Sequence, residues 1–126
     1  MIVETTSSPK LTVAIAGAGG YIGSWFIEKY KDHYHLIGLS RKKVDLNPYP
    51  EVEWRQVELY SITSTVEALR GVDVAIYLVH SMNASTRLNQ GSFEDTDLLL
   101  ADNFSRAAEL NGVKQIVYLG GLSALA

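Results

Sequence analysis

The sequence contains no cysteine, and this absence excludes disulfides and thiolate metal sites. It also lacks any apolar run as long as a membrane span. The formal net charge is only -3, so the chain lacks the basic surplus that is typical of nucleic-acid-binding proteins. The three histidines do not form a metal-ligand spacing pattern with the carboxylates. We therefore expect a soluble cytoplasmic protein with no nucleic-acid partner, no membrane partner and no metal.

What the sequence does contain is enough apolar material for one folded domain. The chain has 126 residues, of which 47% are hydrophobic, a normal proportion for a globular protein. Residues 1–10 lack the basic start and the apolar centre of a signal peptide. We expect residues 1–10 to be a disordered lead and residues 11–126 to form the domain.

Strand-like and helix-like segments alternate along the whole domain. The apolar runs predict strands at residues 11–16, 35–39, 52–59, 72–79 and 113–119. The helical patterns cover residues 21–31, 61–70 and 93–110. Buried strands joined by helices indicate an α/β fold, with a parallel sheet between two helical layers. Right-handed crossovers favour the strand order 3-2-1-4-5.

Local details of these helices can also be predicted. Ser61 or Thr63 is expected to cap the second helix, because a hydroxyl can accept a hydrogen bond from a first-turn amide. Apolar side chains at helical spacing should face the core. In the first helix this set is Ile22, Phe26, Ile27 and Tyr30, and in the last it is Leu98, Leu99, Phe104 and Ala108.

The most informative motif is a glycine turn between the first strand and the first helix. Gly17 is expected to turn the chain off the strand, and Gly23 to let the helix pack closely. Gly20 has no Cβ, which would allow a phosphate to approach the backbone closely. The helix then begins at Tyr21 and Ile22, whose amides would point at a diphosphate. The turn therefore predicts a dinucleotide site, the alternative being an ordinary turn that binds nothing.

Three segments together resemble a known family. Gly-Ala-Gly-Gly-Tyr-Ile-Gly at residues 17–23 looks like the fingerprint of extended and atypical short-chain dehydrogenases/reductases. Residues 71–82 and 102–121 are similar to the fourth-strand and fifth-strand units of the NAD-dependent epimerase/dehydratase-like subgroup. The resemblance implies a Rossmann fold, a nicotinamide dinucleotide cofactor and an N-terminal position within a longer protein.

Arg41 bears on the choice between NADP and NAD. NAD-specific sites carry an acidic residue at the end of the second strand, where this chain has Ser40, Arg41 and two lysines. A guanidinium can hold a 2′-phosphate through two parallel hydrogen bonds, and the Ser40 hydroxyl can add a third donor. We expect NADP(H) to be preferred, with NAD(H) as the alternative. A solvated basic loop with no ligand would have the same composition.

Further cofactor contacts are expected where the third and fourth strands end. The family places an Asp-Leu pair near the adenine, and this chain has Glu58 and Leu59, the carboxylate being one methylene longer. The alternative for Glu58 is a surface carboxylate. Leu78, Val79 and His80 should pass beside the riboses. We take His80 as a positional rather than a catalytic residue.

Asn103 has two readings of similar weight. The family often carries an asparagine near the cofactor side of the long helix, which would give Asn103 a part in the site. An exposed polar residue on the helix surface is the alternative.

The resemblance leaves the activity open. It implies an NADP(H)-dependent oxidoreductase or epimerase acting on a small-molecule substrate, with a homodimer formed through the long helix. The family's catalytic Tyr-x-x-x-Lys pair is missing from these 126 residues. The alternatives are a non-catalytic redox sensor or regulatory module that binds NADP(H), and a domain that binds no nucleotide at all.

Overall fold

The computed structural model describes residues 10–43, 49–78 and 90–118, and residues 90–97 by their backbone alone. Its five strands form one parallel sheet in the order β3-β2-β1-β4-β5, which confirms the predicted topology. The strands are β1 (Thr12–Ala16), β2 (His35–Ser40), β3 (Glu53–Gln56), β4 (Val74–Tyr77) and β5 (Gln115–Tyr118). The helices are α1 (Tyr21–Tyr30), α2 (Ile62–Ala68) and α3 (Gln90–Leu110).

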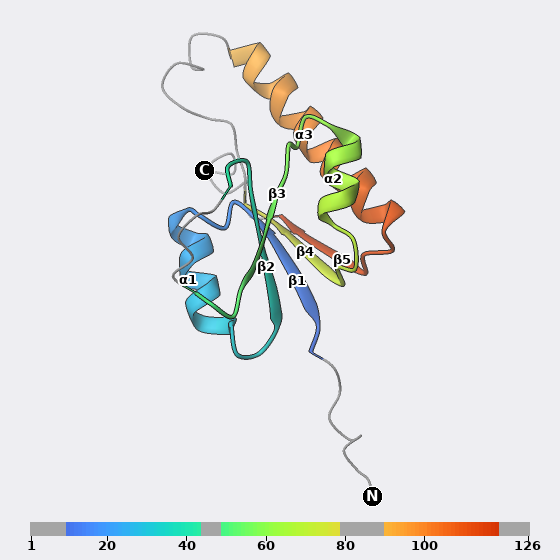
Figure 1. Cartoon of the computed structure of the whole chain (residues 1–126). Coiled ribbons are helices and arrows are strands. Elements are labelled where there is room, and N and C mark those ends of the chain that lie inside the picture. Colours follow the sequence, from blue (N-terminus) through green and yellow to red (C-terminus); the bar gives the residue numbers. More distant parts are fainter. Residues whose placement is uncertain (1–9, 44–48, 79–89, 119–126) are drawn as a thin grey trace, which may run out of the picture.

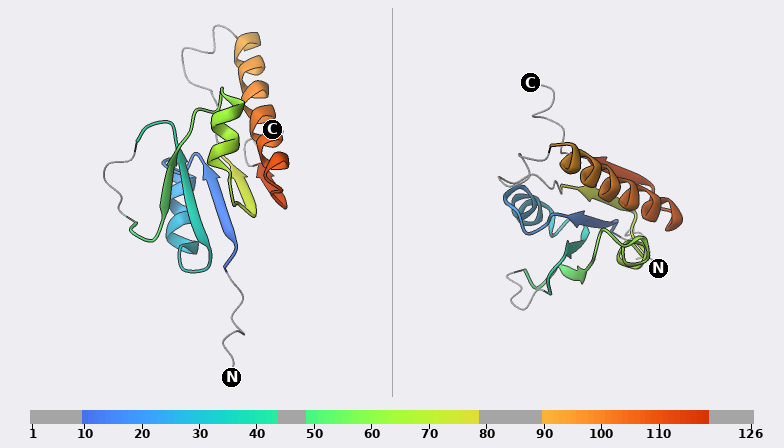
Figure 2. Two further views of the ribbon diagram at one scale, coloured as in Figure 1. Left: turned by 45° about the vertical axis from the view of Figure 1, so that its right-hand side comes forward. Right: turned by 90° about the horizontal axis from the view of Figure 1, so that it is seen from above.

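The sheet lies between two helical layers, as expected for this fold class (Figure 1). Seen from above, α1 covers one face and α3 the other, with α2 on the same side as α3 (Figure 2). Because all strands are parallel, their carboxyl ends lie along one edge of the sheet. No helix within the described ranges combines the length and apolarity that crossing a bilayer requires.

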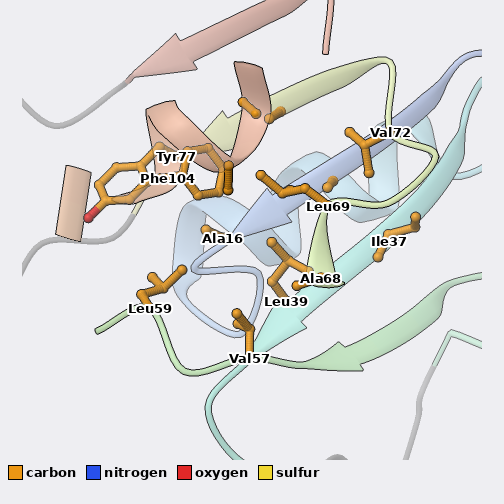
Figure 3. Close-up of a cluster of buried hydrophobic side chains, with 14 of the residues drawn as sticks. Ala16, Ile37, Leu39, Val57, Leu59, Ala68, Leu69, Val72, Tyr77 and Phe104 are labelled. Carbon is orange, nitrogen blue, oxygen red and sulfur yellow. The ribbon is translucent and has the colours of Figure 1, made fainter. Parts of the chain in front are cut away.

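Each face of the sheet has its own apolar cluster. Figure 3 shows the larger one, in which Phe104 of α3 meets Tyr77 of β4 and Leu69 follows α2. The smaller cluster places Ile27 of α1 against Ile15 of β1. Successive side chains of a strand point to opposite faces of the sheet and so enter opposite clusters. Both faces of the sheet are therefore buried.

The ends of the helices follow from identifiable residues. Ser61 caps α2, since its hydroxyl oxygen accepts a hydrogen bond from the Ser64 amide at 3.1 Å. Of the two predicted caps, Ser61 is therefore correct and Thr63 is not. Gly71 and Gly112 follow α2 and α3 with φ of +78° and +71°, a left-handed conformation that glycine adopts without steric cost.

The structure corrects several predicted boundaries and burials. β3 is shorter than residues 52–59, and α3 begins at Gln90 rather than at residue 93. Leu98 and Leu99 are 69% and 46% exposed, because α3 turns the face containing Leu100 and Phe104 towards the sheet. Ile22 is half exposed for a similar reason: Gly23 and Ile27 form the buried face of α1.

Candidate functional site

The β1–α1 turn leaves the first amides of the helix without a side-chain cap. Gly17 has φ of +93°, and its carbonyl accepts a hydrogen bond from the Gly20 amide at 3.1 Å. Gly20 is the N-cap residue and has no side chain to accept from the helix. The amides of Tyr21 and Ile22 therefore begin α1 with no partner inside the helix, an arrangement that suits an anion.

The glycines of this turn differ in whether the fold requires them. A Cβ on Gly23 would lie 2.6 Å from the Gly17 carbonyl oxygen and 2.7 Å from backbone atoms of Ala18. The fold thus requires glycine at position 23, because α1 packs too closely against the turn to leave room for a Cβ. A Cβ on Gly20 would meet nothing nearer than 3.5 Å, and one on Gly19 nothing within 4 Å. Neither of these two has a positive φ, so the protein alone gives no reason for glycine at either position.

Three hydrogen bonds fix the backbone where β2 ends. The Ser40 carbonyl accepts from the Val57 amide at 2.8 Å, and the Ser40 hydroxyl accepts from the Lys42 amide at 3.2 Å. The side-chain amide of Gln56 donates to the Arg41 carbonyl at 3.1 Å. Arg41, Lys42 and Lys43 are all exposed, and none has a described carboxylate within 4.0 Å.

The turn after β3 is held by its own side chains. The Glu58 carboxylate accepts from the Tyr60 amide at 3.2 Å, and the Glu58 amide donates to the Ser64 hydroxyl at 2.9 Å. Leu59 is buried in the larger cluster. One oxygen of the predicted adenine-side carboxylate is therefore already engaged with local backbone.

Asn103 connects this turn to the long helix. It is only 5% exposed, and its side-chain amide donates to the Leu59 carbonyl at 2.8 Å. The prediction that Asn103 is an exposed polar residue on the helix surface is therefore wrong. The bond joins residues 44 apart, so nothing in the local pattern could have identified it.

The end of β4 completes this edge of the sheet. Leu78 continues the pairing with β1, since its amide donates to the Ala16 carbonyl at 2.9 Å. The predicted site residues Val79 and His80 lie outside the described residues. The other predicted site residues all lie at the carboxyl ends of β1, β2, β3 and β4 or at the start of α1.

A charged cluster lies at the opposite, amino edge. Glu53 opens β3, and its carboxylate accepts from Arg55 Nε at 2.8 Å and lies 3.2 Å from His35 Nε2. The Arg55 hydrogen bond is the main cause that holds the pKa of Glu53 below its ordinary value of 4.5, and partial burial opposes it. Arg55 also donates to the carbonyls of Ala68 and Arg70 where α2 ends. Within the described ranges, no three His, Asp or Glu side chains are grouped as metal ligands would be.

The chain is similar in sequence to known proteins. Residues 17–126 match a family model described as NAD(P)H-binding. "Auxiliary protein GraX" of Staphylococcus aureus is 33% identical over 116 residues, which are 89% of this chain and 37% of that protein. GDP-mannose 3,5-epimerase 1 of Oryza sativa subsp. japonica is 28% identical over 88% of this chain and 31% of its own length.

The fold has a solved counterpart. The crystal structure of UDP-N-acetylglucosamine 4-epimerase from Bacillus cereus superposes with a TM-score of 0.70 at 25% identity, covering 86% of this chain and 36% of that one. The chain therefore spans about a third of the length of each of these three proteins.

Proposed function

Because the chain belongs to the NAD(P)H-binding family, we propose that its β1–α1 turn holds the diphosphate of a nicotinamide dinucleotide and that NADP(H) is the preferred form. The observation that carries the first part is the pair of glycines that the fold does not require. A Cβ at Gly20 would make only an ordinary van der Waals contact with the Gly17 carbonyl oxygen, at 3.5 Å, and would lie directly beside the uncapped helix start. That space is what a diphosphate needs in order to reach the amides of Tyr21 and Ile22.

The basic end of β2 supports the preference for NADP(H). A 2′-phosphate is the only part of the cofactor that distinguishes the two forms, and Arg41 is a cation with no carboxylate partner among the described residues. A guanidinium can bind such a phosphate through two parallel hydrogen bonds. The Ser40 hydroxyl accepts from the Lys42 amide, and its own proton remains available to the same phosphate.

The remaining contacts are proposed along the same edge. Glu58 and Leu59 would lie on the adenine side, and the turn that contains them is held by the hydrogen bond from Asn103 to the Leu59 carbonyl. Leu78, Val79 and His80 follow β4 and would pass beside the riboses. When bound, the nicotinamide supplies hydride transfer, and the task of this chain is to orient the cofactor.

For the whole protein we propose an oxidoreductase or epimerase of the atypical short-chain dehydrogenase type, with residues 11–126 as its N-terminal dinucleotide-binding part. The similarity to two sugar-nucleotide epimerases supports this assignment. The substrate would be a small molecule with a carbonyl or hydroxyl group. The exposed Leu98 and Leu99 on α3 support a homodimer formed through that helix.

One observation favours a second candidate, a non-catalytic NADP(H)-binding regulator. The relative with 33% identity is named an auxiliary protein. Both candidates require the dinucleotide. Assays of the full-length protein separate them: net oxidation of NADPH by a carbonyl substrate, or redox-neutral interconversion of epimers, is expected only of the first candidate, and the second predicts neither.

Replacing Gly20 with serine tests the proposed diphosphate site. Serine is a good N-cap residue and its Cβ fits the folded turn, so Gly20→Ser should unfold at the same denaturant concentration as the unmodified chain or at a higher one. The side chain of the introduced serine would occupy the space in which we propose that the diphosphate binds. We expect NADP+ binding, measured by isothermal titration calorimetry, to weaken at least about 10-fold, the loss of one or more charge-assisted hydrogen bonds.

Gly23→Ala is the matched control for a glycine that the fold does require. Its Cβ would meet backbone atoms at 2.6 Å and 2.7 Å, so we expect a loss of about 1–3 kcal/mol in the free energy of unfolding. A Gly20→Ser protein that is folded and binds NADP+ as tightly as before would exclude the proposed diphosphate site.

A further inference from the structure

We propose that Gln56 is a positioning residue that sets NADP selectivity by fixing the backbone of Arg41. The inference rests on the proposed function and adds a residue to it. Gln56 would touch no part of the cofactor. It would act through Arg41, and only on the form of the dinucleotide that carries a 2′-phosphate.

The geometry places Gln56 beside the end of β2. It is the last residue of β3 and is the register partner of Ser40, the last residue of β2. One residue further on, the backbone pairing ends with the Val57 amide on the Ser40 carbonyl. The Gln56 side-chain amide then reaches the next carbonyl, that of Arg41, at 3.1 Å. A side chain thus extends the β2–β3 hydrogen bonding by one residue.

This hydrogen bond is not needed to satisfy a buried group. Arg41 and Gln56 are both exposed, so water would solvate the Arg41 carbonyl if the amide were absent. An exposed hydrogen bond of this kind contributes little to folding. The hydrogen bond from Gln56 instead fixes the direction of the Arg41 backbone, from which the guanidinium side chain projects.

A fixed backbone matters for two-point binding. A guanidinium binds a phosphate through a planar pair of N–H groups, so its hold depends on the direction from which the side chain approaches. Without Gln56, ordering the Arg41 backbone would be a cost of binding NADP+. NAD+ presents a ribose hydroxyl at this place and would not use the guanidinium pair.

The test compares the two dinucleotides in Gln56→Leu, which keeps an exposed strand residue and removes the donor. Calorimetric titration should show the dissociation constant for NADP+ rising about 3- to 10-fold, the range of one lost hydrogen bond. The constant for NAD+ should stay within about twofold. Gln115→Leu is the matched control, because Gln115 is also an exposed strand glutamine but opens β5 at the amino edge, and it should change neither constant.

A double-mutant cycle tests whether Gln56 acts through Arg41. In an Arg41→Ala background, Gln56→Leu should change the NADP+ constant by no more than about twofold, because the side chain that it positions is gone. Equal weakening of NADP+ and NAD+, no change in either, or a full effect in the Arg41→Ala background would each overturn the inference while leaving dinucleotide binding intact. Failure of the unmodified chain to bind either dinucleotide would instead overturn the proposed function, and the inference with it.

Discussion

The two edges of the sheet treat their charges in opposite ways. At the amino edge Glu53 contacts Arg55 and His35, and Asp73 accepts a hydrogen bond from the Thr12 amide at 2.9 Å. At the carboxyl edge Arg41, Lys42 and Lys43 meet no described carboxylate. The charges named at the amino edge hold the fold, and the three cations at the carboxyl edge have no described carboxylate to neutralise them. Our proposal of a binding site at the carboxyl edge rests on this difference, because unpaired cations lie at the same edge as the uncapped start of α1.

The largest expected effect lies at the carboxyl edge and concerns binding alone. Arg41→Asp removes the guanidinium and places a carboxylate where the 2′-phosphate would lie. We expect NADP+ affinity to fall about 10- to 100-fold, and NAD+ to become the preferred dinucleotide, because a carboxylate can accept from the ribose hydroxyl. Calorimetric titration with both dinucleotides measures the reversal. If the variant still prefers NADP+, the assignment of Arg41 is wrong.

The opposite outcome is expected at the amino edge, where Asp73→Ala should reduce stability alone. The substitution leaves the Thr12 amide without its acceptor at the start of β1. Urea denaturation should show a loss of about 1–3 kcal/mol in the free energy of unfolding, the cost of a partly buried amide left unpaired.

The control for Asp73 is another aspartate, on α3. Asp102→Ala breaks an exposed pair with Arg106 at 3.7 Å and should cost less than about 0.5 kcal/mol. If Asp73→Ala changed NADP+ affinity and left stability unchanged, it would contradict the claim that charges at the amino edge stabilise the fold and do not take part in binding.

Apart from the Asp102 control, the smallest effect is the pH dependence contributed by Glu53. Because the pKa of Glu53 is lower in the folded chain than its ordinary value of 4.5, its ionised form stabilises the fold above that pH. The contribution is lost as the pH falls below about 4.5 through the folded value. Since the side chain is 43% exposed, we expect less than about 1 kcal/mol.

Glu53→Gln should flatten that part of the stability profile between about pH 5 and pH 3, as measured by urea denaturation at each pH. NADP+ binding at neutral pH should be unaffected. An unchanged acid profile in the variant would show that other carboxylates account for the acid sensitivity.

The sequence was sufficient for what depends on local pattern. Apolar runs predicted all five strands, and crossover handedness predicted their order, because both follow from burial and chirality. The glycine turn could be located for the same reason: the positive φ of Gly17 and the close contact at Gly23 are local demands. The exposure of Leu98 and Leu99 was missed because adjacent leucines cannot show which side of a helix meets the sheet.

What the sequence could not supply are contacts between distant residues. The Asn103 bond to Leu59 and the Gln56 bond to Arg41 cross 44 and 15 residues, and each depends on where the sheet brings its strand ends. A side-chain amide has no sequence signature for such a role, since the same residue on an open surface would look identical. The sequence therefore predicted the edge of the sheet at which the candidate residues lie, and it did not predict the hydrogen bonds that hold those residues in place.

Trp54 offers a consequence for observing this framework directly. Its ring lies where a Cβ on Gly38 would be, at 2.5 Å from the ring carbons, so the indole spans β2 and β3 two residues before Gln56. The only other tryptophan, Trp25, is largely exposed on α1. In a Trp25→Phe variant, tryptophan fluorescence would therefore come from Trp54 alone, whose indole lies across the two strands that end at Ser40 and Gln56. A change in the fluorescence of Trp54 on addition of a ligand would therefore report a movement of those strands.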